Sequence, residues 1–181
     1  MLLDPEGNVL EAADGLRPSS EIKMHLPCYD KRDDVMSVIH AHPPGATGFA
    51  VAHKAMDMYN MIEDVAVIGA VPLTPYGTPS TVEVPNAIEP YLEAHDVMLL
   101  ENHGALAVGS DVITAFYRME SLELWAKITI NAVILGGSHD ISQTIFKSSL
   151  ICGAITESPA VTRATNNLTR MTNCCTRKTK E

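Results

Sequence analysis

Two histidines, His40 and His42, end an apolar segment that is followed at once by Pro43 and Pro44. In a β-strand, residues i and i+2 project from the same face, so a strand here would point both imidazoles the same way. Two such imidazoles supply half of a zinc site, because a catalytic zinc typically takes three protein ligands and keeps one position open. This spacing alone is also common in hydrogen-bonded histidines that bind no metal, so the hypothesis needs a third ligand.

The best candidate for the third ligand is His103. It also ends an apolar segment, VMLLENHG, and the small residues Gly104 and Ala105 after it leave room for a close approach. Glu21 is the most plausible carboxylate to join the three histidines. It could act as a fourth ligand and then, once substrate displaces it, as a base for proton transfer.

Three further side chains are candidates for binding or proton transfer. Ser19 and Ser20 precede Glu21 and could either bind an anion at the start of a helix or simply cap that helix. Tyr76 lies in the loop PLTPYGTPS. Its phenol could donate a proton or could pack with its hydroxyl in water. We interpret the remaining histidines as surface or structural residues: His25, His53, His95 and His139.

Length and composition predict one globular domain and exclude some partners. A chain of 181 residues with 46% hydrophobic content is long enough for one domain with a substantial core. A net charge of -9 disfavours nucleic acid, whose phosphates need clustered Lys and Arg. No apolar run reaches the roughly 18 residues of a membrane helix, and the N-terminus does not resemble a signal peptide. We therefore expect a cytoplasmic protein without a membrane partner, with the four cysteines reduced.

Strands and helices in alternation are expected to position these residues. We predict a hairpin over 2–12, a helix starting at Ser19 or Ser20, a strand over 35–42, a helix over 45–54, a strand over 65–73, a helix over 84–94, a strand over 97–100, a continuation of the sheet over 105–108, and a helix over 111–135. The histidine candidates then lie at strand ends, where sheet proteins often gather their functional groups.

Four motifs, PSSEIKMH, VIHAHPPGATGFA, VPLTPYGTPS and LLENHGALAVG, occur in this order. Together they resemble the class II aldolase/adducin family, which includes L-fuculose-1-phosphate aldolase. The resemblance implies an α/β fold with three α/β/α layers around a central, mostly antiparallel sheet. It covers a domain over 1–137, for which we expect the family's N-terminal portion to be missing, and leaves 138–181 as a poorly defined C-terminal extension.

The resemblance also implies roles for the candidate residues. One zinc ion per subunit would be held by His40, His42 and His103, with Glu21 as the acid/base residue. Ser19 and Ser20 match the serines that bind substrate phosphate. Tyr76 matches a tyrosine that reaches into the site of a neighbouring subunit, which implies a homotetramer.

The resemblance predicts a zinc-dependent aldolase. The reaction is the reversible retro-aldol cleavage of a small ketose phosphate to dihydroxyacetone phosphate and an aldehyde. Two alternatives stay open: a sugar-phosphate 4-epimerase of the same family, and a non-catalytic adducin-like interaction module. Adducin-type domains lack the metal histidines, so the three histidines of this chain favour an enzyme.

Overall fold

The structure of the chain is a computed structural model that describes residues 1–142. Most of the predicted extension over 138–181, with Cys152, Cys174 and Cys175, lies outside the described residues. In chain order the elements are β1 (Leu2–Leu3), β2 (Val9–Glu11), α1 (Ile22–Lys31), β3 (Ser37–Ala41), α2 (Pro44–Val51), α3 (Ile62–Val67), β4 (Leu73–Thr74), α4 (Glu83–Leu92), β5 (Val97–Leu100), β6 (Gly104–Gly109) and α5 (Val112–Ile134). Within 1–142, none of the helices combines the length and the apolar character needed to cross a membrane.

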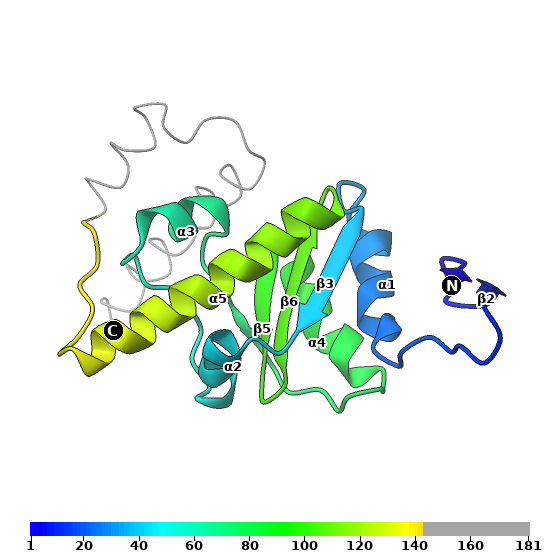
Figure 1. Ribbon diagram of the computed structural model, residues 1–181, viewed down its shortest axis with the longest axis horizontal. Helices are drawn as coiled ribbons and strands as arrows, with labels where there is room; N and C mark the ends of the chain where they lie inside the picture. Colours follow the sequence, from blue (N-terminus) through cyan, green and yellow to red (C-terminus); the bar gives the residue numbers. More distant parts are fainter. Residues whose placement is uncertain (143–181) are drawn as a thin grey trace, which may run out of the picture.

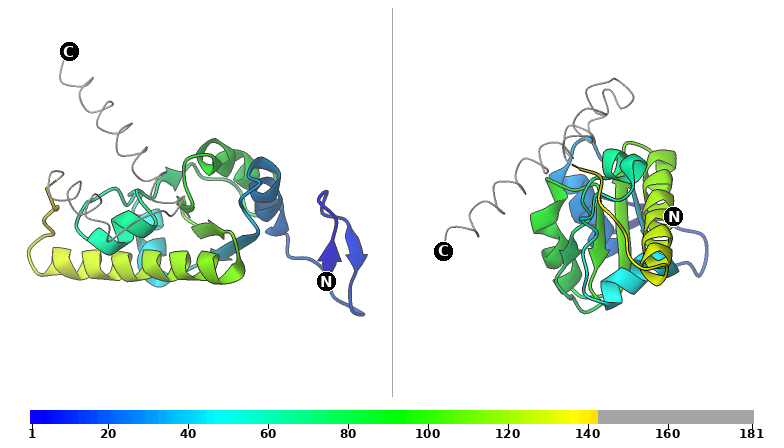
Figure 2. Two further views of the ribbon diagram at one scale, coloured as in Figure 1. Left: turned by 90° about the horizontal axis from the view of Figure 1, so that it is seen from above. Right: turned by 90° about the vertical axis from the view of Figure 1, so that its left-hand side faces the viewer.

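The central sheet has four strands in the order β3-β6-β5-β4. β6 pairs antiparallel with both β3 and β5, and only the short β4 runs parallel to its neighbour β5. Helices α2 and α5 cover one face of the sheet, while α1 and α4 cover the other (Figures 1 and 2). The predicted fold class, an α/β/α arrangement around a mostly antiparallel sheet, is therefore confirmed.

Alternating side chains on the buried strands create a hydrophobic core on each face. In β5, Val97 and Leu99 pack with α5, whereas Met98 and Leu100 pack with α1 and α4. All the residues of β5 and β6 are buried, which explains why these strands read as continuous apolar runs rather than as alternating ones. Burying each large aliphatic side chain contributes about 1.5–3 kcal/mol, so the two cores account for much of the stability of the sheet.

The predicted hairpin and the predicted helix over 111–135 are both confirmed. β1 and β2 pair antiparallel around the turn that contains Gly7. Asp111 caps α5, since its carboxylate accepts a hydrogen bond from the Thr114 amide at 2.8 Å. Gly136 and Gly137 follow the helix in backbone conformations with positive φ, which glycine adopts readily at a helix end.

The predicted strand over 65–73 is wrong. Helix α3 covers the first residues of this segment, and only β4, at the end of the segment, joins the sheet. Val65 and Ile68 bury their side chains in the core beside α5. Tertiary packing of these β-branched residues thus outweighs their modest preference for strands.

The predicted start of the first long helix is also corrected. Neither Ser19 nor Ser20 is the N-cap, because α1 begins at Ile22 and Glu21 occupies the capping position without a side-chain cap. The hydroxyl of Ser19 instead accepts a hydrogen bond from the Glu21 amide at 3.3 Å. This arrangement puts the Glu21 carboxylate at the very start of the helix rather than inside its first turn.

A buried cluster of charges ties one end of the sheet to two helices. The Asp96 carboxylate lies 2.7 Å from Arg32 and 2.8 Å from Arg118, and its side chain is only 3% exposed. Arg118, from α5, also donates to the carbonyl oxygen of Val108 in β6. Asp96 comes directly before β5, whereas His103 follows the other end of that strand. The charge cluster and the histidines therefore lie at opposite ends of the sheet.

Candidate metal centre

The three candidate histidines meet at one end of the sheet. His40 lies in β3 and His42 just beyond it, and His103 lies in the turn between β5 and β6. Pairing of β3 with β6 brings the two segments together, since His40 stands opposite Leu106. The ring centroids are 4.7–5.1 Å apart, and one nitrogen from each ring lies within 4.8 Å of the others.

Hydrogen bonding fixes which nitrogen of His40 faces the cluster. Its Nδ1 lies 3.0 Å from the carbonyl oxygen of Ala105, and a carbonyl can only accept, so Nδ1 carries the proton. Its Nε2 is then free of hydrogen and lies 3.1 Å from Nε2 of His42. Two nitrogens bound to one tetrahedral zinc at about 2.0–2.1 Å lie about 3.3–3.4 Å apart, so this pair fits a shared cation.

Burial keeps His40 in the form that binds metals. Removal from water lowers the pKa of His40 to about 4, against the opposing effect of its hydrogen bond to Ala105. The ring is therefore neutral near pH 7, and neutral imidazole is the metal-binding form. Burial also lowers the pKa of His103, which the nearby Glu21 carboxylate partly offsets.

Glu21 lies beside one of the histidines. One of its carboxylate oxygens is 3.9 Å from Nε2 of His103. The side chains of His103 and Glu21 are 12% and 22% exposed, so both remain reachable from a cavity. A carboxylate at this distance is close enough to join the cation or to exchange a proton with a ligand after a small movement.

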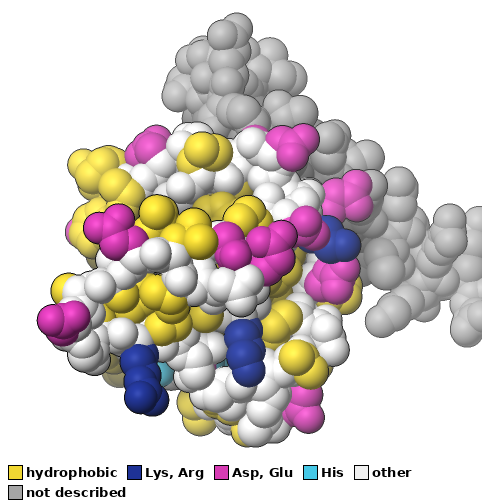
Figure 3. Space-filling view, turned by 90° about the vertical axis from the view of Figure 1, so that its right-hand side faces the viewer, with side chains coloured by type: hydrophobic (Ala, Val, Ile, Leu, Met, Phe, Trp, Pro, Cys, Tyr) yellow, Lys and Arg dark blue, Asp and Glu magenta, His cyan; other side chains and the backbone are white. Residues whose placement is uncertain are grey.

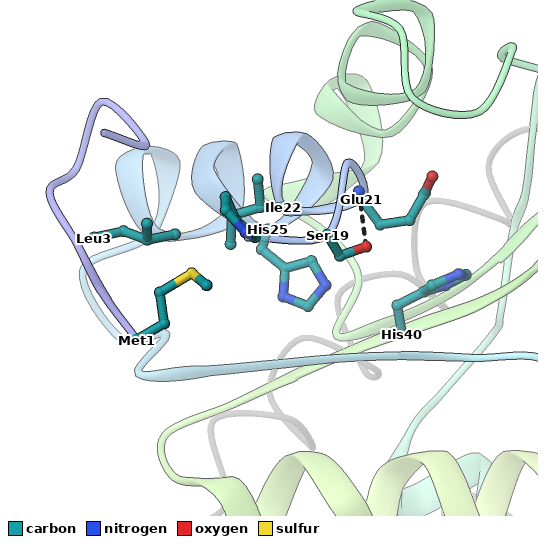
Figure 4. Close-up of a pocket in the computed structure, with 8 residues that line it drawn as sticks. Met1, Leu3, Ser19, Glu21, Ile22, His25 and His40 are labelled. Carbon is teal, nitrogen blue, oxygen red and sulfur yellow. Dashed lines mark hydrogen bonds between the residues drawn. The ribbon is translucent and has the colours of Figure 1, made fainter. Parts of the chain in front are cut away.

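A cavity of about 350 Å³ adjoins the cluster. Ser19, Glu21, His25 and His40 contribute polar groups to its wall. Figure 4 shows these side chains between α1 and β3, with Met1 on the side of the N-terminal hairpin. His25, interpreted from the sequence as a surface or structural residue, is half-buried and lines this cavity.

The structure separates the two candidate serines. Ser19 lines the cavity, but the hydroxyl of Ser20 pairs with the hydroxyl of Ser80 at 2.7 Å. Tyr76 does not line the cavity and is 52% exposed in the loop after β4. Within the described part of one chain, Tyr76 is thus not among the residues that line this cavity, and its predicted role depends on a neighbouring copy.

One residue that organises the site could not be predicted from the sequence. Glu123, in α5, accepts hydrogen bonds from the amides of Gly45 at 3.0 Å and Ala46 at 2.9 Å. These amides lie in the first turn of α2, where a carboxylate also suits the helix dipole. Glu123 thereby fixes the start of the helix that follows His42. No local signal could reveal this role, because the partners are far apart in the sequence.

Gly104 is required for the close approach of the two histidine segments. A Cβ atom at this position would lie 2.5 Å from Cδ2 of His42 and 2.6 Å from the carbonyl oxygen of Ala41. We expect Gly104→Ala to lower the free energy of unfolding by about 1–3 kcal/mol and to weaken metal binding, because β3 or His42 must shift. Urea denaturation and a metal titration would measure the two effects.

Gly48→Ala provides the matched control. Gly48 lies inside α2, and nothing would come within 4 Å of its added Cβ. The same substitution there is expected to raise the free energy of unfolding by about 0.5–1 kcal/mol. Equal effects of the two substitutions would contradict the assigned role of Gly104.

A family model described as Class II Aldolase and Adducin N-terminal domain matches residues 1–130. The chain belongs to this family. The L-fuculose phosphate aldolase of Methanocaldococcus jannaschii is 31% identical to this class II aldolase/adducin domain over 130 residues, which cover 71% of the chain and 67% of the relative. The 3-oxo-tetronate 4-phosphate decarboxylase of Haemophilus influenzae is 30% identical over 132 residues, which cover 70% and 61%.

Solved structures agree with the sequence relatives. An L-fuculose 1-phosphate aldolase structure superposes on the class II aldolase/adducin domain with a TM-score of 0.73 and 32% identity, covering 81% of this chain and 68% of that chain. The chain spans about two-thirds of the length of the curated relatives it matches.

Proposed function

We propose that the chain is a zinc-dependent aldolase that catalyses the reversible retro-aldol cleavage of a small ketose phosphate. The products would be dihydroxyacetone phosphate and an aldehyde. The observation that carries the proposal is the convergence of three imidazoles within 4.8 Å, with a carboxylate 3.9 Å from one of them. The names of the relatives, L-fuculose phosphate aldolase among them, support the reaction class.

The donor set suits a divalent cation such as Zn²⁺. Three neutral imidazoles from His40, His42 and His103 would hold it and leave a position for substrate oxygen atoms. A cation bound there would supply a Lewis acid that stabilises the electron pair left when the carbon–carbon bond breaks.

Protein side chains would handle the proton and the phosphate. Glu21 would remove the proton from dihydroxyacetone phosphate in the condensation direction and return it during cleavage. Ser19, whose hydroxyl faces the cavity, would contact the substrate phosphate. Figure 3 shows Lys or Arg side chains beside a histidine on this face of the molecule, together with acidic side chains. Tyr76 of a neighbouring copy in a homotetramer would protonate the aldehyde oxygen.

The direct test is release of dihydroxyacetone phosphate. Purified protein loaded with Zn²⁺ is incubated with L-fuculose 1-phosphate, and the product is reduced by glycerol-3-phosphate dehydrogenase while NADH consumption is followed. We expect Glu21→Gln to lower kcat by about 10²–10⁴-fold with its zinc content unchanged. Glu89→Gln is the matched control, because this exposed residue of α4 pairs with Lys31 away from the cavity.

The same incubation separates the alternatives. An intact substrate skeleton with inverted stereochemistry would indicate the 4-epimerase. A relative named as a decarboxylase favours carbon dioxide release from a 3-oxo acid phosphate as the second candidate, so this substrate class is tested in parallel. A protein that binds no zinc and leaves every substrate unchanged would support the non-catalytic module and overturn the proposal.

A further inference from the structure

Two buried polar atoms beside the candidate metal centre have no hydrogen-bond partner among the described residues: Oγ1 of Thr74 and Nδ1 of His103. Thr74 is 1% exposed. Leaving such a group unsatisfied is unfavourable, so a buried polar atom normally has a partner. Two such atoms close together indicate a shared one.

The fold brings the two residues to the same place. β4 pairs parallel with β5, and Thr74 stands directly opposite Leu100. Leu73 packs toward the core beside α5, so the next residue, Thr74, faces α4. The chain then turns after β5, where the His103 amide donates to the Leu100 carbonyl at 3.0 Å. Thr74 and His103 therefore border the same space on the α4 side of the sheet.

Both residues line one small cavity, together with Leu100 and Glu101 and, from α4, Val84 and Ala87. The centre of a water molecule could occupy a volume of about 10 Å³ in this cavity. That volume holds roughly one water, and a buried water needs about two to four polar partners. The threonine hydroxyl and the imidazole provide two partners, and Glu101 adds polar atoms to the wall.

We propose that this cavity binds a single water that links Thr74 to His103, which makes Thr74 a positioning residue for the metal centre. The water accepts the proton of Nδ1–H on His103 and donates to Oγ1 of Thr74. A proton held on Nδ1 leaves the lone pair on Nε2, the nitrogen that lies 3.9 Å from Glu21. The inference rests on the metal-binding part of the proposed function and adds the residue that sets the orientation of one ligand.

Two substitutions at Thr74 separate its hydroxyl from its shape. Thr74→Val keeps the shape and removes the hydroxyl, whereas Thr74→Ser keeps the hydroxyl. The dissociation constant for Zn²⁺ is measured by competition with a chromophoric chelator. We expect Thr74→Val to weaken zinc binding about 10–100-fold, as loss of a partner behind a metal ligand does, and Thr74→Ser to stay within about 3-fold of the parent.

A control substitution and a second readout complete the test. Thr47 in α2 has another buried hydroxyl without a partner among the described residues, so Thr47→Val repeats the chemistry at a position outside this cavity. In the metal-free protein, ¹⁵N NMR of the imidazole nitrogens reports where the His103 proton resides. We expect a proton held on Nδ1 in the parent and in Thr74→Ser, and a mixture of the two tautomers in Thr74→Val.

Unchanged zinc affinity together with an unchanged tautomer in Thr74→Val would overturn the inference. If the parent protein binds no zinc, the proposed function fails. The nitrogen resonances of the metal-free protein then still decide whether Thr74 controls the tautomer of His103.

Discussion

His40→Ala is expected to abolish stable zinc binding and to reduce lyase activity to background. Loss of a hydrogen-bond partner behind a ligand already costs about 10–100-fold in metal affinity, so loss of the ligand itself should cost more than about 100-fold. The hydrogen bond from Nδ1 of His40 to the Ala105 carbonyl oxygen, which orients the ring, is also lost when His40 is replaced by alanine. Elemental analysis of the purified variant and a zinc titration would measure the change.

His139→Ala serves as the control for this experiment, because His139 is exposed and lies beyond α5. Circular dichroism would establish that both variants keep the fold, as expected for a site at the edge of the sheet. Stoichiometric zinc retained in His40→Ala would contradict the proposed ligand set. Activity retained without zinc would contradict the metal-dependent reaction.

Asp96→Ala is expected to cause the largest loss of stability. It leaves Arg32 and Arg118 without the buried carboxylate that lies between them. Removing one partner from a buried ion pair typically costs about 3–5 kcal/mol, because the remaining charge stays out of water. That is a large share of the roughly 5–15 kcal/mol by which native domains are stable. Urea denaturation at a fixed protein concentration would report the shift in midpoint.

Asp34→Ala is the matched control for the charge cluster. Asp34 also pairs with Arg32, at 2.8 Å, but its side chain is 50% exposed. Arg32 keeps its buried partner Asp96 in this variant, and Asp34 itself is half exposed, so Asp34→Ala should lose clearly less stability than Asp96→Ala. A small effect of Asp96→Ala would show that water reaches the cluster and that the two arginines do not depend on this carboxylate.

The positions of the histidines along the chain could be predicted from local patterns. The alternation in 35–42 and the end of each apolar run indicated that the histidines lie at the ends of strands, because strand geometry is local. Their convergence could be inferred only from the ordered motifs of the family. Spacing within one strand could not show that β6 would bring His103 beside His40.

Residues that support the site through distant contacts escaped prediction. Glu123 binds the first turn of α2 from α5, far along the chain, and Thr74 lines the same small cavity as His103 only because β4 pairs with β5. The last part of α3, residues 65–67, was predicted as the start of a strand because its β-branched residues fit the strand pattern equally well. In each case, tertiary contacts determined the outcome and left no periodic signal.

His42 and His103 are separated by about 60 residues along the chain yet lie side by side in space. A cation shared between them would be a reversible cross-link between the end of β3 and the turn after β5, and it would form only in the folded chain. The protein in a chelating buffer and in a zinc-containing buffer would then differ in how stably the end of β3 is joined to the turn after β5.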